Sequence, residues 1–155
     1  MLTTLCHFLN FDEWANRRVI ESVRTVPAAR AKALGPLAHL LTAERAWLER
    51  ILGDDSTTDF WPEATLDDCV SWLDENRAAW DRFSNGARGG DAGGIVSYRN
   101  SKGVEYRTPL SEILTHLLTH GAHHRGQVLQ LVREEGGSPI PVDYIVFVRE
   151  VEGQP

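Results

Sequence analysis

The segment between Pro109 and Glu135 constrains the fold more than any other part of this sequence. Apolar residues recur in it every three or four positions, which is the period of one face of an α-helix. Proline is favoured in a first helical turn, and Gly136 and Gly137 follow directly after the segment, where a helix is expected to end. The sequence therefore predicts one long helix with an apolar face.

Three earlier segments show the same helical period and are bounded by residues that start or stop helices. Pro27 ends the first, Pro36 suits the first turn of the second, and Gly53 ends the second. Thr65 and Asp68 have the spacing of a capping box at the start of the third. We therefore expect helices at residues 2–26, 36–52 and 65–84, with a loop at 53–64.

Two shorter elements complete the expected fold. Residues 95–99 and 104–107 alternate weakly around the turn sequence Asn100-Ser-Lys-Gly103, which predicts a β-hairpin. The glycine-rich residues 85–94 predict a flexible connector, and residues 142–151 predict a short C-terminal helix. The predicted fold is all-α: a four-helix bundle in a single domain, residues 1–155, with a short β-hairpin before the last long helix.

The composition argues against several classes of protein. The chain has 22 acidic and 16 basic residues and a formal net charge of −6, whereas a general nucleic-acid binder usually carries a basic face. No apolar run approaches the ~20 residues needed to cross a bilayer, and the first residues lack the pattern of a secretory signal. Cys6 and Cys69 are isolated, so we expect reduced thiols. These features predict a cytoplasmic protein with neither a membrane nor a nucleic-acid partner.

The histidines of the long helix carry the main functional signal. His120 and His124 lie four positions apart, on the same face as Ile113 and Leu117, so both imidazoles should point into the bundle. Two imidazoles at this spacing can chelate one metal ion, and His39 in the second helix is the best candidate for a third ligand. Three protein nitrogens would leave one coordination position open, as in catalytic sites. The alternative is a set of core histidines satisfied by hydrogen bonds.

Other polar residues are weaker candidates for a role at this site. His116 precedes His120 by one turn and can support it without binding a metal ion. Asp12 and Asn16 lie on or near the inner face of the first helix, and Asp12 can partner a ligating histidine. A position for Asp12 at the solvent boundary is nevertheless the favoured interpretation.

The sequence around the histidine pair contains residues with two interpretations each. Gly121 and Gly126 inside a helix indicate close approach of a neighbour, although simple tolerance is as good an explanation for Gly121. Arg125 and Gln127 can hydrogen-bond across the bundle or at a subunit contact, and a solvated position is reasonable for Arg125. We expect His123 at the edge of the bundle and His7 at the surface or its boundary.

Known metal motifs narrow the type of site. The sequence has no HExxH motif, which excludes a zincin, and it lacks the paired Glu-x-x-His motifs of a di-iron bundle. Imidazole ligands suit zinc, nickel, copper and iron. We therefore expect one divalent metal ion, with zinc, nickel and iron as the leading candidates.

Several short motifs occur in a characteristic order along the chain. The strongest is Leu118–Gln127, which contains the pattern His-x-x-x-His-Arg-Gly-Gln. The others are Trp14-Ala-Asn16, His39-Leu-Leu-Thr-Ala-Glu44, Trp47-Leu48, Tyr98, Gly103 and Pro141-Val-Asp-Tyr144. In this order and spacing they resemble the DinB family over nearly the whole chain.

The resemblance implies a four-helix bundle that binds a divalent metal ion through His39, His120 and His124. Members of the family are often homodimers, and some relatives are thiol S-transferases that join a low-molecular-weight bacterial thiol to an electrophile. Asp12 departs from the family, which usually has asparagine there, and places an extra negative charge near the predicted site.

These observations lead to one functional hypothesis and two alternatives. The first is a metal-dependent enzyme that acts on a small-molecule substrate, as a thiol S-transferase using a low-molecular-weight thiol. The alternatives are a metal-dependent hydrolase and a non-catalytic bundle that binds a metal ion or a ligand. An open coordination position favours an enzyme, whereas a fourth protein ligand favours a structural site.

Overall fold

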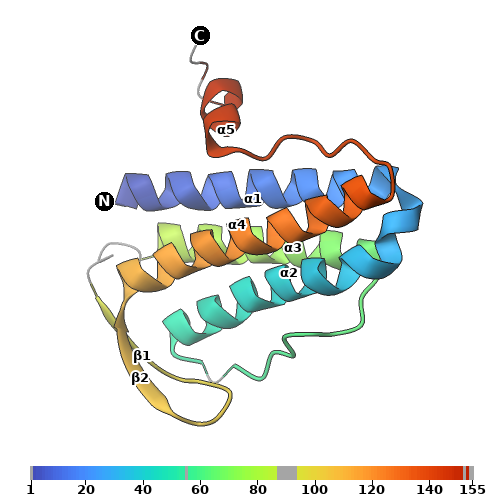
Figure 1. The fold of residues 1–155 in the computed structure, drawn as a ribbon. Coiled ribbons are helices and arrows are strands. Elements are labelled where there is room, and N and C mark those ends of the chain that lie inside the picture. The colour runs from blue at the N-terminus through green and yellow to red at the C-terminus, as the bar shows by residue number, and fades with distance from the viewer. Residues whose placement is uncertain (1, 55, 87–93, 152, 154–155) are drawn as a thin grey trace.

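The computed structural model describes residues 2–54, 56–86, 94–151 and 153, with side chains from residue 7 onward (Figure 1). Four long helices form a bundle, and a short antiparallel hairpin and a short C-terminal helix are attached to it. The predicted four-helix bundle with these two additions is therefore confirmed. The elements are α1 (Leu2–Thr25), α2 (Arg30–Leu52), α3 (Leu66–Asn85), β1 (Ile95–Arg99), β2 (Glu105–Pro109), α4 (Leu110–Glu134) and α5 (Tyr144–Val151).

The core lies between the four long helices. α2 packs mainly against α4 and α3, and α1 packs against the same two helices (Figure 1). Burying one large aliphatic side chain stabilises the folded state by roughly 1.5–3 kcal/mol, so these contacts hold α2 and α4 side by side. The core contains one cluster that includes Val19, Leu37, Leu41, Leu73 and Val132, and a second that includes Leu48, Trp80, Leu110 and Leu114.

The second helix begins earlier than its sequence predicts. Residues Pro27–Ala29 form a 3₁₀ turn, and α2 starts directly after it, so Pro36 lies inside the helix rather than in its first turn. An interior proline removes one helical hydrogen bond and costs about 3 kcal/mol. Ala33 and Leu37 on either side of it are fully buried. Their packing continues the apolar face past the proline and offsets that cost.

The predicted start of α3 is confirmed. The Thr65 hydroxyl accepts a hydrogen bond from the Asp68 backbone N–H at 3.2 Å, and the Asp68 carboxylate accepts one from the Thr65 backbone N–H at 2.8 Å. This reciprocal pair is a capping box, which satisfies two backbone donors at the start of the helix. The connector predicted at residues 85–94 falls largely outside the described residues.

The hairpin leads directly into α4. Ile95 pairs with Pro109 and Arg99 with Glu105, so the second strand runs two residues further than the predicted 104–107. The Leu110 backbone N–H donates to the Gly94 carbonyl at 2.9 Å, which joins the first turn of α4 to the base of the hairpin. The hairpin therefore lies against the C-terminal end of α2 and the N-terminal end of α4 (Figure 1).

The C-terminal helix covers part of α1. After α4 the chain runs back along the bundle to α5 (Figure 1). The Phe147 ring of α5 lies 5.6 Å from the Phe11 ring and 5.5 Å from the Trp14 ring, measured between ring centroids. Within the part of the chain that the structure describes, no helix has the length and apolarity needed to span a membrane.

Candidate metal centre

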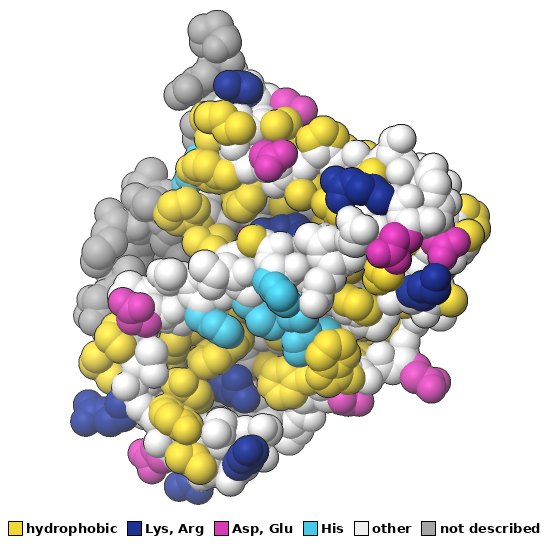
Figure 2. Space-filling model, in the orientation of Figure 1, with side chains coloured by type: hydrophobic (Ala, Val, Ile, Leu, Met, Phe, Trp, Pro, Cys, Tyr) yellow, Lys and Arg dark blue, Asp and Glu magenta, His cyan; other side chains and the backbone are white. Residues whose placement is uncertain are grey.

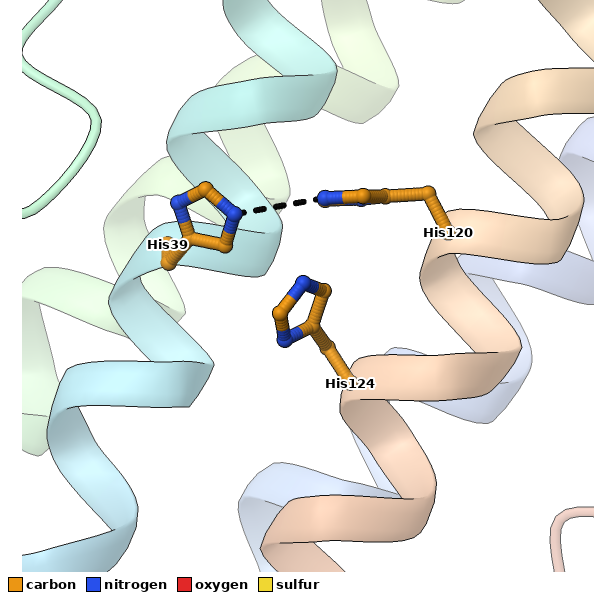
Figure 3. Close-up of side chains that lie close together, drawn as sticks. All are labelled: His39, His120 and His124. Atoms are coloured by element: carbon orange, nitrogen blue, oxygen red, sulfur yellow. Dashed lines mark hydrogen bonds between the residues drawn. The ribbon is translucent and has the colours of Figure 1, made fainter.

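Three imidazoles from two helices meet at the face where α2 and α4 pack together. His39 comes from α2, and His120 and His124 come from successive turns of α4 (Figure 3). One ring nitrogen of each lies within 4.8 Å of the other two, and His39 Nε2 is 3.2 Å from His120 Nε2. His124 is buried, and the other two are partly buried. The structure therefore brings together the three histidines selected from the sequence.

The outer ring nitrogens of two of these histidines are engaged by neighbouring groups. His39 Nδ1 donates to the Phe60 backbone carbonyl at 2.8 Å. His124 Nδ1 donates to the Gln127 side-chain oxygen at 2.8 Å. A neutral imidazole has one N–H, so these bonds leave each Nε2 as an acceptor, and that of His39 faces His120 Nε2 at 3.2 Å. Hydrogen bonds of this kind fix the ring and the tautomer in metal-ligating histidines.

The spacing of the nitrogens fits a mononuclear ion. Zinc binds imidazole nitrogen at about 2.0–2.1 Å, which places two ligands of a tetrahedral site about 3.4 Å apart. The 3.2 Å separation of His39 and His120 is close to that value. Among the described residues the group consists of these two histidines and His124, so one tetrahedral position would remain for a small molecule.

The protonation of the site also suits a metal ion. Burial, together with the neighbouring histidines His124 and His39, lowers the pKa of His120 to about 4. Burial likewise lowers the pKa of His124, although its hydrogen bond to Gln127 acts in the opposite direction. Both rings are therefore neutral at pH 7, which is the form that binds metal ions.

Aromatic side chains from a loop and from α2 border the site. The Trp61 ring is stacked on the His39 ring, with centroids 3.9 Å apart and an interplanar angle of 5°. Trp61 is 61% exposed, so it separates His39 from solvent on one side only. On the other side, the His116 ring lies 5.4 Å from the His120 ring and 5.4 Å from the Trp47 ring. Figure 2 shows the histidines gathered on this face among hydrophobic side chains.

The sequence did not indicate the roles of Phe60, Trp61 or Gln127. The Phe60 carbonyl and the Trp61 ring belong to the loop after α2. No sequence spacing predicts their contacts with His39, because the path of that loop depends on the tertiary fold. The contact of Gln127 with His124 could have been predicted, because Gln127 lies three positions after His124 and therefore on the same side of the helix. It also contacts His123 Nε2 at 3.1 Å, and His123 itself is exposed at the edge of the bundle as expected.

The favoured position for Asp12, at the solvent boundary, is wrong. Asp12 is 8% exposed, and its carboxylate accepts from Arg125 at 2.6 Å and from Asn16 at 3.0 Å. Arg125 is 2% exposed rather than solvated, because its guanidinium crosses from α4 to α1 to reach this carboxylate. The extra charge of Asp12 is thus paired with Arg125, and no hydrogen bond joins the described Asp12 carboxylate to a histidine of the cluster.

The two glycines near the histidine pair differ in their surroundings. A Cβ atom on Gly121 would lie 2.9 Å from both Arg125 Nη1 and Asp12 Oδ1, so the predicted close approach holds there. A Cβ atom on Gly126 would meet no described atom within 4 Å. The expectation of a close neighbour at Gly126 is therefore not met within the described chain. His7 lies at the boundary and contacts the Tyr144 hydroxyl at 2.6 Å.

Two further titratable groups lie outside the histidine cluster, Glu44 partly buried and Cys69 buried. The Glu44 carboxylate accepts from Trp80 Nε1 at 2.7 Å and from Asn76 Nδ2 at 3.3 Å, which ties α2 to α3. Burial, together with the nearby charge of Asp12, raises the pKa of Glu44 to about 8. The Cys69 thiol is free and buried, and burial raises its pKa to about 12. Cys69 is therefore a poor nucleophile.

A bundle of four helices with three imidazoles at the face between α2 and α4 defines a helical-bundle protein whose residues can bind a metal ion. The chain matches the DinB family over residues 1–153 and belongs to that family, as its motifs predicted. It is also similar to Protein DinB of Bacillus subtilis (strain 168), with 36% identity over 42 residues. That match covers 27% of this chain and 24% of the relative's length. No solved structure matches the chain significantly.

Proposed function

We propose that the protein is a metal-dependent enzyme in which His39, His120 and His124 bind one divalent metal ion. The observation that carries the proposal is the arrangement of the ring nitrogens, which lie within 4.8 Å of one another. The outer nitrogens of His39 and His124 are occupied by Phe60 and Gln127, which turns the inner nitrogens toward one another, with His39 Nε2 3.2 Å from His120 Nε2. Zinc, nickel and iron all suit three imidazoles.

The proposed reaction is the transfer of a low-molecular-weight thiol to an electrophilic small molecule. A divalent ion held by the three histidines would lower the pKa of a thiol bound at its open position. The sulfur forms a bond to the electrophilic carbon, the bond from that carbon to the leaving group breaks, and the thiol proton passes to a base. Cys69 is excluded as the nucleophile because its thiol is buried and protonated, so the nucleophile comes from the substrate.

His116 is the residue that we propose as the base. It is exposed, its ring lies 5.4 Å from that of His120, and burial of part of the ring lowers its pKa. A neutral imidazole beside the site can accept the thiol proton at a ring nitrogen near pH 7. Trp47 packs against the other side of His116 and restrains the ring.

The test begins with metal binding and then measures the reaction. Chelator-treated protein is reloaded separately with zinc, nickel and ferrous iron, and bound metal is measured by elemental analysis. Small bacterial thiols are then combined with a chromogenic electrophile, using loaded protein, stripped protein and free metal in buffer. Conjugation that is faster with loaded protein than with free metal supports the proposal.

Two controls separate the parts of the proposal. The His124→Ala variant should lose both bound metal and conjugation, whereas His123→Ala, one position away and exposed, should keep both. Metal binding without any thiol conjugation would refute the transferase. Metal-dependent hydrolysis of an ester or amide by the same loaded protein would establish the hydrolase in its place.

A further inference from the structure

Arg50 on α2 is a buried cation without a hydrogen-bond partner among the residues that the structure describes. The residue is 9% exposed, and its Nε atom is buried without any acceptor. Among the described residues, no carboxylate, hydroxyl or carbonyl group accepts a hydrogen bond from its guanidinium. Buried charges in folded proteins are nearly always paired, so an unpaired one needs an explanation.

Three aromatic rings surround this guanidinium. Its central carbon lies 4.8 Å from the centroid of Trp47, 5.6 Å from that of Phe60 and 5.7 Å from that of Tyr98. Cation–π contacts of this kind hold the group in place, but they do not supply acceptors for its N–H groups. Burial lowers the pKa of Arg50 from its ordinary value, and the nearby Tyr98 and Glu49 oppose this effect only in part.

The acidic residues nearby do not fill this role. Glu49 precedes Arg50 on α2, but its carboxylate accepts from Thr58 at 2.9 Å and from Arg45 at 3.3 Å. Asp54 and Glu105 are exposed at the surface, where water and salt screen their charge.

Arg50 lines a pocket between the end of α2 and the hairpin. The pocket has a volume of about 170 Å³, well above the roughly 30 Å³ that one water molecule occupies. Ser56 and Ser97 bring hydroxyl groups to its wall, and Arg99 is a second, exposed cation at the rim. Asp54 and Glu105 also line the pocket, and their carboxylates repel anions. The ligand must therefore be an anion small enough to reach Arg50 itself.

A series of ring contacts connects Arg50 to the histidine cluster through Trp47 and His116. Arg50 lies about 16 Å after His39 along the axis of α2, and helical side chains lean toward the N-terminus, which brings the guanidinium closer. Trp47 links the two, because its ring contacts Arg50 on one side and His116 on the other.

We propose that Arg50 forms an anion-binding subsite that takes a carboxylate or phosphate group of a small molecule lying across Trp47 toward the three histidines. A guanidinium binds either group through two parallel N–H···O bonds, and the serine hydroxyls can donate to the same oxygens. That this anion is one end of the thiol substrate rests on the function proposed above. The anion subsite itself does not depend on a bound metal ion.

The first experiment tests the subsite alone in metal-free protein. Sodium phosphate and sodium acetate are titrated separately, with sodium chloride as the ionic-strength control, while the Arg50 Nε–H and Trp47 Nε1–H NMR signals are followed. Phosphate or acetate should shift both signals saturably, and chloride should not. Arg50→Met should weaken binding of the effective anion by roughly tenfold to hundredfold, and Arg50→Lys by less.

Stability measurements separate binding from a structural role. Replacing an unpaired buried cation with methionine of similar volume should leave the unfolding midpoint in urea unchanged or raise it. Arg82→Met, at an exposed position of α3, is the matched control and should alter neither binding nor stability. The proposal is overturned if neither anion shifts the two signals, or if Arg50→Met binds anions as the wild type does.

The second experiment tests the link to the proposed reaction. A cysteinyl dipeptide with a free C-terminal carboxylate is compared with the same dipeptide as its amide, using metal-loaded protein. The carboxylate form should have the lower KM in the wild type, and the difference should vanish in Arg50→Met. Equal KM values in the wild type, with anion binding intact in the first experiment, would refute the substrate assignment. A failure of the transferase reaction with both dipeptides would count against the proposed function and leave the anion subsite standing.

Discussion

The Nε2 atoms of His39 and His120 lie 3.2 Å apart although the two residues are 81 positions apart in the chain. They meet because α2 and α4 run antiparallel against each other in the bundle (Figure 1). Two nitrogen lone pairs at this distance repel unless a proton or a cation lies between them. The separation of these two atoms therefore depends directly on whether a proton or a metal ion lies between them.

Loss of one ligand should abolish stoichiometric metal binding. We expect the His39→Ala and His124→Ala variants each to retain little metal after dialysis, because two imidazoles hold an ion far less tightly than three. His7→Ala and His123→Ala should retain the wild-type content, measured by elemental analysis. Full metal occupancy in the His39→Ala/His124→Ala double variant would contradict the assignment.

The hydrogen bond from His124 to Gln127 should strengthen metal binding without Gln127 contacting the ion. Replacing such a partner typically lowers metal affinity by about 10–100-fold, since the ring loses its fixed tautomer and orientation. Gln127→Ala should therefore weaken binding within that range in a competition titration with a chromophoric chelator. Gln130→Ala, an exposed position of the same helix, is the control and should bind as the wild type does.

The contribution of His120 to the stability of the metal-free protein should fall as the pH drops from about 6.5 toward 4. The pKa of His120 is about 4 in the folded chain, against about 6.5 in an unfolded one. Between these values the unfolded chain binds more protons, so acid favours unfolding. Glu44 acts oppositely, because its raised pKa of about 8 makes the folded chain the better proton acceptor from about pH 4.5 to 8.

Comparison with a variant isolates the histidine contribution. Urea unfolding of wild type and His120→Gln should be compared at several pH values between 4 and 7. The free energy of unfolding should decline less steeply in the variant as the pH falls. Parallel curves for the two proteins would show that His120 does not carry the depressed pKa.

The ion pair between Asp12 and Arg125 should be strongly coupled. Removing one member of a buried pair leaves an uncompensated charge and typically costs about 3–5 kcal/mol. Asp12→Ala should lower the free energy of unfolding by that amount, measured with urea. The Asp12→Ala/Arg125→Met double variant should recover most of the loss, since no buried charge is then left unpaired. Equal stability of the single variant and the wild type would contradict the pairing.

We expect a homodimer, and the exposed side of α5 is the surface on which we would test it. Phe147 of α5 packs against the rings of Phe11 and Trp14 on α1, so this part of α1 is covered within the subunit. Ile145 and Val151 remain 51% and 57% exposed on that helix. Exposed apolar side chains close together often mark an interface. Ile145→Asp should shift the wild-type dimer toward the 17.3 kDa monomer in sedimentation equilibrium, and a wild type that is monomeric at micromolar concentration would contradict the expectation.

The helices and the histidine pair could be read from the sequence because they depend on neighbouring residues. The spacing of His120 and His124 places both rings on one face of any helix that contains them. The capping box of Thr65 and Asp68 likewise acts over three positions, and it was predicted correctly. The start of α2 was predicted wrongly, because the burial of Ala33 and Leu37 by other helices outweighs the local effect of Pro36.

The remaining features of the site depend on how distant segments pack, and only the tertiary structure reveals them. The Phe60 carbonyl that orients His39 and the Trp61 ring stacked on it belong to a loop whose path has no periodicity to detect. Arg125 and Asp12 appeared to be surface residues because a charge in a helix sequence normally lies in solvent, until a partner on another helix neutralises it. Arg50 is buried by Trp47, Phe60 and Tyr98, from three segments of the chain.

Local spacing thus determined which imidazoles share a helix face. The packing of α1, α2, α4 and the hairpin decided which groups surround those imidazoles, because contacts between distant residues leave no local pattern in the sequence.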